Sequence, residues 1–279
     1  MIEDKGEAAK QRAAALYMRG IAYIARGDVD RALVDYDEAI RLDPGNGLTF
    51  NERGLAFEAK GDLDRAIAEF DRAVELRPGN ADIHYNRGKA LLRVDEIDRA
   101  IADFDQAIKL GTASIVATAA SDAITKLTAA RIKSDYFHIR AHARFVQGKY
   151  ADAASDYAEV VALRRDDPYP ALQLHLARAR SGQSGGIAEL QAAKSAIKPG
   201  EWPYPVVELL LNRKTAMETL AAALTPDQRC EAQYYVGEYN LLRGDIMAAE
   251  TALETAAHSC TTEFTEYQLA RSELKRLRR

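Results

Sequence analysis

The feature that most constrains the fold is a repeat of 34 residues in the first part of the chain. Three blocks align without gaps when they begin at Ala13, Gly47 and Ala81. Glycine stands at the eighth position of each block, alanine at the twentieth and twenty-seventh, and an aromatic residue at the twenty-fourth. These columns are Gly20, Gly54 and Gly88; Ala32, Ala66 and Ala100; Ala39, Ala73 and Ala107; and Tyr36, Phe70 and Phe104. Such a chain is expected to stack identical small units rather than to close one core.

Each block predicts a pair of helices. Apolar residues recur at helical spacing over about 14 residues, and a second helical stretch follows a short interruption. In the first two blocks the interruptions are Gly27-Asp28 and Gly61-Asp62. Glycine can end the first helix in a left-handed conformation, and aspartate can cap the second. Because helices this short are marginal in water, the hairpins must stack to bury their apolar faces.

These columns resemble those of the tetratricopeptide repeat (TPR). Pro44 and Pro78 occupy the thirty-second position in the first two blocks, and Thr112 replaces proline in the third. The resemblance implies an all-α solenoid of helical hairpins wound into a right-handed superhelix. It also implies a non-enzymatic scaffold that binds a protein or peptide client.

The rest of the chain predicts a second, less regular stack and a terminal cap. Ala119, Ala123, Leu127 and Ala130 lie at helical spacing after the third block, so one extra helix is expected there. An unpaired helix interrupts a regular array, so the chain is expected to divide near residue 133. The predicted N-terminal stack, 1–133, holds repeats 13–46, 47–80 and 81–114 and an extra helix over 115–133. The predicted C-terminal stack, 134–279, holds divergent repeats near 134–167, 168–199 and 230–261 and a capping helix over 262–278.

The C-terminal half resembles the NlpI-like TPR lipoproteins of the bacterial envelope. The resemblance lies in the run from Trp202 to Leu211 and in the run from Glu231 to Tyr239. It implies a homodimeric adaptor in the periplasm that serves an envelope protease or cell-wall enzymes. The acylated cysteine of that family has no counterpart here, so membrane anchoring is not implied. The alternatives are a cytoplasmic TPR scaffold with an unrelated client, and a structural unit that only assembles with itself.

The TPR resemblance also implies where a client binds. In that family the fifth, ninth and twelfth positions of the first helices face the concave side of the array. The lining predicted here is aromatic and aliphatic with scattered polar groups, which suits an extended peptide or a partner helix. Packing of some of these residues against the N-terminal segment or the extra helix is the alternative. The predicted groove residues are Tyr17, Ile21, Ile24, Asn51, Leu55, Glu58, Tyr85, Lys89, Leu92, His138, His142 and Phe145.

One well-known TPR ligand is disfavoured. Chaperone-binding members of the family hold a C-terminal carboxylate with a set of Lys, Asn and Arg residues. The corresponding positions here are Tyr17, Ile21, Glu52, Asp82 and Asn86. Because this set lacks lysine and arginine, a heat-shock co-chaperone role is not expected.

Two further columns carry opposite charges. Arginine stands at the seventh position of four units, and an acid stands at the twenty-third. We predict that each arginine pairs with the acid of its own hairpin, which fixes the register of the two helices. The alternative is a basic groove that binds anions. The residues are Arg19, Arg53, Arg87 and Arg140, and Asp35, Glu69, Asp103 and Asp156.

No catalytic or metal-binding set is recognisable. His138 and His142 share one helix face, a spacing that could serve a metal, but no third ligand or glutamate base accompanies them. The glycine-rich stretch 182–186 joins two predicted helices, whereas a phosphate loop joins a strand to a helix. The sequence therefore predicts no enzyme, no metal and no cofactor.

Charge and hydropathy exclude other classes of partner. The chain has 38 Lys and Arg against 42 Asp and Glu, a net charge of −4. No basic field is available to hold nucleic acid. No apolar run reaches the roughly 20 residues of a membrane span, and residues 1–6 are polar where a signal peptide would carry an apolar segment. The expected partner is a protein or a peptide.

The only two cysteines, Cys230 and Cys260, frame the last predicted hairpin. One opens its first helix and the other follows its second, and these ends lie side by side in an antiparallel hairpin. A disulfide between them is therefore predicted, and it would favour an oxidising compartment such as the periplasm. The alternative is two buried free thiols in a cytoplasmic protein.

Overall fold

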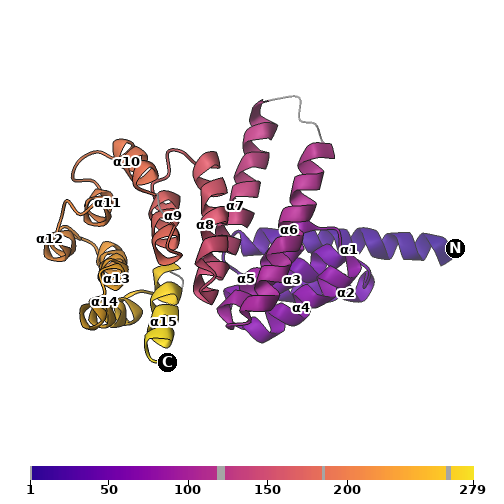
Figure 1. Ribbon diagram of the computed structural model, residues 1–279. Helices are drawn as coiled ribbons and strands as arrows, with labels where there is room; N and C mark the ends of the chain where they lie inside the picture. Colours follow the sequence, from indigo (N-terminus) through magenta and orange to yellow (C-terminus); the bar gives the residue numbers. More distant parts are fainter. Residues whose placement is uncertain (1, 118–122, 184–185, 262–264) are drawn as a thin grey trace. The chain divides into compact units, whose positions relative to one another are not determined.

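The computed structural model describes residues 2–117, 123–183, 186–261 and 265–279, and within these ranges it contains helices and no strand (Figure 1). The chain divides into two compact units, residues 1–129 (unit 1) and residues 130–279 (unit 2).

Unit 1 consists of three consecutive helical hairpins. Each helix packs against its hairpin partner, and each hairpin packs against the next one. The first helices of neighbouring hairpins also contact one another, α1 with α3 and α3 with α5. The hairpins are α1 (Ile2–Ile24) with α2 (Val29–Leu42), α3 (Gly47–Ala59) with α4 (Leu63–Leu76), and α5 (Ala81–Arg93) with α6 (Ile97–Ala117).

The turns inside the hairpins follow from the predicted turn residues. Gly27 and Gly61 both adopt φ of 77°, a left-handed conformation that glycine accepts without strain. The next residues, Asp28 and Asp62, cap α2 and α4 by accepting hydrogen bonds from backbone N–H groups of the first turn. In the third hairpin Asp95 takes the glycine position at φ 62°. Short polar residues tolerate this conformation best after glycine.

The glycine column makes room for an aromatic ring inside each hairpin. A Cβ added to Gly54 would lie 2.7 Å from the Phe70 ring, and one added to Gly88 would lie 2.6 Å from the Phe104 ring. The same rings also seat the next hairpin, since Phe70 forms one buried cluster with Ala66 and with Ala90 of the following unit. The repeat columns therefore set both the packing within a hairpin and the packing between hairpins.

Gly54→Ala is expected to destabilise unit 1 by about 1–3 kcal/mol, because the added methyl group overpacks the Phe70 ring. Helix propensity alone favours alanine over glycine by about 1 kcal/mol, so a measured loss has to come from packing. Gly6→Ala is the matched control, since Gly6 also lies in a helix, α1, and a Cβ there has no atom within 4 Å. Thermal unfolding followed by circular dichroism gives both values. Equal stability of the two variants would contradict this packing.

Unit 2 is built from helices of uneven length, from the 6 residues of α12 to the 25 residues of α7. Its hydrophobic core contains side chains from helices along the whole unit, from the first to the last. Among them are Phe145, Tyr157, Leu172, Tyr235 and Leu274. The last helix, α15, packs on α13 and α14. The helices are α7 (Ala123–Gln147, which begins in unit 1), α8 (Tyr150–Leu163), α9 (Tyr169–Arg180), α10 (Ile187–Ser195), α11 (Tyr204–Leu210), α12 (Ala216–Ala221), α13 (Pro226–Leu242), α14 (Ile246–Ser259) and α15 (Thr265–Leu277).

The prediction of a separate helix over residues 115–133 is wrong. Residues 115–117 are the end of α6, and residues 123–133 are the first part of α7; residues 118–122 lie outside the described ranges. The helical spacing of the alanines and Leu127 was a correct sign of helix, but it fits a prolongation of a neighbouring helix equally well. The first helix of the repeat near 134–167 accordingly begins at residue 123.

Candidate functional site

The predicted groove residues of unit 1 lie on the first helices of the three hairpins, α1, α3 and α5. We call this set the first-helix face. Seven of its nine members are partly or largely exposed. The prediction of open positions is wrong for Asn51 and Leu92, which are buried; the Asn51 amide is bonded to Glu52 and Asn86, and Leu92 belongs to the hydrophobic core. The face comprises Tyr17, Ile21 and Ile24 on α1; Asn51, Leu55 and Glu58 on α3; and Tyr85, Lys89 and Leu92 on α5.

The two tyrosines of the face rest on the core. The Tyr17 ring packs on Tyr36 with centroids 6.5 Å apart, and the Tyr85 ring packs on Phe104 with centroids 6.2 Å apart. Burial and the nearby Glu52 carboxylate raise the pKa of the Tyr17 phenol, so it stays protonated at neutral pH. Each tyrosine is thus partly exposed, while its ring also contacts a buried aromatic ring of the core.

Polar groups link neighbouring first helices across the face. Asn86 Nδ2 on α5 donates to Asn51 Oδ1 on α3 at 3.0 Å, and Asn51 Nδ2 donates to Glu52 Oε1 at 3.1 Å. Arg93 on α5 pairs with Glu58 on α3 at 3.2 Å. These contacts hold the side chains of the face in fixed positions.

The arginine column forms the predicted pairs within hairpins. Arg19 bonds to Asp35 through both Nε and Nη2, Arg53 bonds to Glu69, Arg87 to Asp103 and Arg140 to Asp156 in the same two-pronged way. In every pair the partners are 16 residues apart. The prediction of register-fixing pairs is confirmed, so these arginines are not free to bind anions.

The prediction of open groove positions in unit 2 is wrong for two of three residues. His142 is 3% exposed and its Nε2 contacts Gln268 Oε1 at 3.0 Å, while Phe145 is 2% exposed and packs edge-on against Tyr150 at 4.9 Å. The reason is α15, which lies against this part of α7: its Arg276 donates to the backbone carbonyl of Phe145. The C-terminal helix therefore covers these two positions of α7.

His138 is half-buried and packs edge-on against Tyr157 at 5.9 Å. Burial lowers the pKa of both His138 and His142 to about 4, so both imidazoles are neutral at neutral pH. Among the described residues, no group of three or more His, Cys, Asp and Glu side chains is arranged to hold a metal ion.

Unit 2 also contains a buried ionic cluster that sequence reasoning missed. Arg180 donates to Glu238 Oε2 at 2.9 Å and to Glu273 Oε2 at 2.8 Å, and the Tyr150 hydroxyl donates to Glu273 Oε1 at 2.9 Å. Burial, with the neighbouring Glu273 charge, raises the pKa of Glu238 to about 8. Its members come from α8, α9, α13 and α15. No local pattern could have brought them together, and a structural role in the core explains them.

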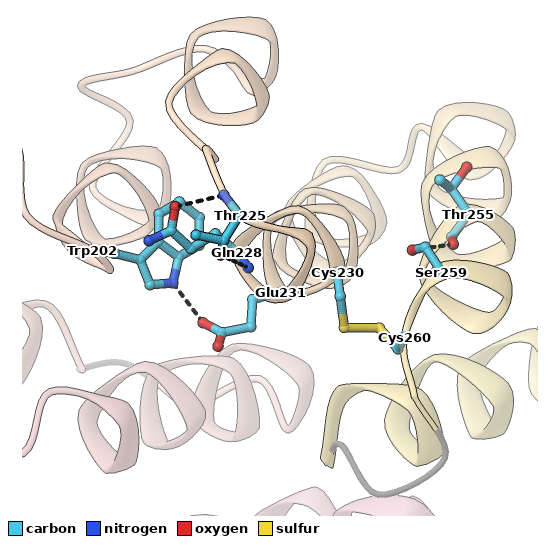
Figure 2. Close-up of a disulfide and its surroundings, with 8 residues drawn as sticks. All are labelled: Trp202, Thr225, Gln228, Cys230, Glu231, Thr255, Ser259 and Cys260. Carbon is cyan, nitrogen blue, oxygen red and sulfur yellow. Dashed lines mark hydrogen bonds between the residues drawn. A yellow bond between two sulfur atoms is a disulfide. The ribbon is translucent and has the colours of Figure 1, made fainter.

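Cys230 and Cys260 are joined in a disulfide, with Cα atoms 5.0 Å apart. Figure 2 shows it linking α13 to the residue that follows α14. On the other side of α13, the Trp202 indole N–H donates to Glu231 Oε2 at 2.7 Å (Figure 2). The two runs that carry the NlpI-like resemblance therefore meet at Trp202 and Glu231.

Within the ranges that the structure describes, no helix is both long and apolar enough to cross a bilayer.

Comparison with known proteins identifies the repeats. The tetratricopeptide repeat family matches residues 13–46 and 81–110, and a TPR repeat family matches residues 54–95. The prediction of TPR units in this part of the chain is confirmed.

Solved structures share the fold over most of the chain. A tetratricopeptide repeat protein from Parabacteroides merdae is 13% identical with a TM-score of 0.59, covering 94% of this chain and 98% of its own. Pseudomonas aeruginosa PilF is 15% identical with a TM-score of 0.54, covering 95% and 99%. MamA is 20% identical with a TM-score of 0.55, covering 67% and 92%. At these identities the likeness concerns the fold alone, and it confirms the predicted class of an all-helical solenoid.

Proposed function

We propose that this chain, whose residues 13–110 carry tetratricopeptide repeats, is a non-enzymatic adaptor. Its first-helix face binds an extended peptide or a helix of a client protein. TPR arrays in general mediate protein–protein interaction, and the partly exposed apolar side chains of this face carry the proposal. Tyr17, Ile21 and Leu55 are half-buried, so each keeps apolar surface in contact with water that a client could cover.

The placement of these groups suits a peptide. Rigid tyrosines supply contact area at small entropic cost, and the amide groups of Asn51 and Asn86 are hydrogen-bonded to each other between α3 and α5. Peptides recognised by helical arrays use apolar anchors at regular spacing together with a few hydrogen bonds. Unit 2 is not part of the proposed groove at His142 and Phe145, because α15 covers them.

An oxidising compartment is part of the proposal. Disulfides persist in the periplasm and outside cells and are rare in the cytosol, so the Cys230–Cys260 bond supports the periplasm over the cytoplasm. A role beside an envelope protease or cell-wall enzymes, and a homodimeric state, rest on the NlpI-like runs around Trp202 and Glu231. The rival is a structural unit whose first-helix face is filled by its own partner copy.

Replacing Tyr17 and Tyr85 together by alanine is expected to weaken binding of a client peptide at least about tenfold, because aromatic anchors carry much of the energy of such interfaces. The probe is a peptide selected on the wild-type chain from a display library, and its Kd is measured by fluorescence anisotropy. Val34→Ala is the control: Val34 is 68% exposed and lies on α2, a second helix.

Circular dichroism and sedimentation complete the test. Unchanged helicity with lost binding supports the proposal, whereas a large loss of helicity would show that the tyrosines serve the core. A changed oligomeric mass without peptide binding would favour the structural unit.

A further inference from the structure

Glu52 stands out among the acids beside the first-helix face because it has no cation partner. It lies on α3 next to Asn51, is half-buried, and forms no ion pair with any lysine, arginine or histidine of the described chain. Its one hydrogen bond comes from Asn51 Nδ2 at 3.1 Å. A desolvated carboxylate with a single neutral donor is a costly arrangement in a folded protein.

The neighbouring acids, unlike Glu52, have cation partners. Glu58, six residues further along the same helix, is paired with Arg93 at 3.2 Å, and Glu69 is paired with Arg53 at 2.8 Å. The face has one further cation, Lys89, whose ammonium lies over the Tyr85 ring at 5.6 Å from its centroid. Among the described residues of unit 1, no lysine, arginine or histidine forms an ion pair with Glu52; the charge of Arg77 acts on the adjacent Tyr17 phenol.

The surroundings of Glu52 are aromatic and short of hydrogen-bond partners. Its charge acts on both the Tyr17 and the Tyr36 phenols, and the Tyr36 hydroxyl is buried without a hydrogen-bond partner. Burial raises the pKa of Glu52, and no cation opposes that rise. The amide relay from Asn86 through Asn51 holds the carboxylate in one orientation.

A carboxylate has about four acceptor sites, and the single amide bond leaves most of them open. A lysine brings three N–H donors and an arginine brings five, and either cation also gains from contact with the Tyr17 ring. An acidic or apolar residue at this place would leave the half-buried charge uncompensated. The arrangement therefore favours a basic side chain over every other type.

We infer that the first-helix face recognises a lysine or arginine of its client, with the Glu52 carboxylate, set by Asn51 and flanked by Tyr17, as the acceptor. This inference rests on the proposed function, since it names the residue class that the same face selects. The face would select a client segment with one basic residue among apolar ones.

The test is a double-mutant cycle on a selected peptide. Peptides are selected on the wild-type chain from a display library, and the strongest binder is synthesised with its basic residue and with glutamine in its place. Glu52→Gln is expected to weaken the basic peptide about ten- to a hundredfold, the range of a charge-assisted hydrogen bond. The same substitution should leave the glutamine peptide unchanged. Glu52→Lys should reverse the preference toward acidic peptides.

Glu75→Gln is the matched control, because it removes the same charge from an exposed position on α4 that is paired with Arg72. It should alter neither affinity, and circular dichroism verifies that each variant is folded. Selected peptides without a basic residue, or a cycle in which the two changes simply add, would overturn the inference while peptide binding itself stood. Failure of the library to yield any peptide that depends on Tyr17 and Tyr85 would overturn the proposed function as well.

Discussion

Reducing the Cys230–Cys260 disulfide is expected to lower the free energy of unfolding of unit 2 by about 3–4 kcal/mol. The bond closes a loop with a sequence separation of 30 residues, which restricts the unfolded chain far more than the folded one. It ties α13 to the end of α14 in a unit whose hairpins are irregular.

Urea unfolding followed by tryptophan fluorescence measures this directly. The chain has a single tryptophan, Trp202, which contacts α13 through Glu231 and so reports on unit 2. Addition of a reductant should move the urea midpoint down in the wild type. The double variant Cys230→Ser with Cys260→Ser should unfold at the lower urea midpoint, and this midpoint should be the same with and without reductant. A midpoint that is the same with and without reductant would argue against a stabilising bond.

Glu266→Gln is expected to stabilise unit 2 by about 3 kcal/mol at pH 8 and by little at pH 4. Burial in the first turn of α15 raises the pKa of the Glu266 carboxyl from 4.5 to about 7. The folded unit therefore binds this proton more tightly than the unfolded chain. The stability that the group contributes is fully present below pH 4.5 and is lost as the pH rises through 7.

The measurement is the difference in free energy of unfolding between variant and wild type from pH 4 to pH 8, again by urea and Trp202 fluorescence. Taking the difference cancels the arginine-paired carboxylates, which respond to pH in the opposite sense. Glu159→Gln, an exposed position on α8, serves as the control and should give a flat difference. A flat difference for Glu266→Gln too would mean that this carboxyl is solvated.

What could be predicted from the sequence was local. The hairpins, their turns at Gly27 and Gly61, and the arginine–acid pairs all join residues within one repeat, and the pairs recur at a fixed spacing of 16. Each repeat places such partners at the same spacing, so the same pattern in three repeats strengthens the prediction for each of them. The Cys230–Cys260 contact belongs to the same class, because it closes one hairpin.

The predictions that were wrong, and the contacts that were missed, mostly involve segments far apart in the sequence. His142 and Phe145 are covered by α15, which contacts them from about 130 residues away. The cluster of Arg180, Glu238 and Glu273 likewise joins helices that share no sequence pattern. Helical spacing over 115–133 predicted helix correctly and could not tell a new helix from two longer ones.

One missed element did have a readable signal. Thr215 and Glu218 form a capping box at the start of α12, and Thr225 and Gln228 form another at the start of α13. The Thr-x-x-Glu and Thr-x-x-Gln patterns stand in the sequence at those places. The Thr-x-x-Glu pattern at Thr215 predicts the start of the helix over residues 216–221, which the repeat columns do not reveal.

Site-specific photo-crosslinking tests the central claim most directly. A benzophenone amino acid is placed at Leu55, on the first-helix face, and in a separate variant at Val34, on α2 and 68% exposed. Both proteins are irradiated with the selected peptide and in cells of the source organism, and the adducts are identified by mass spectrometry. The account predicts adducts with the peptide and with one client from position 55, and none from position 34. Adducts from position 34 alone, or equally from both, would contradict binding at the first-helix face.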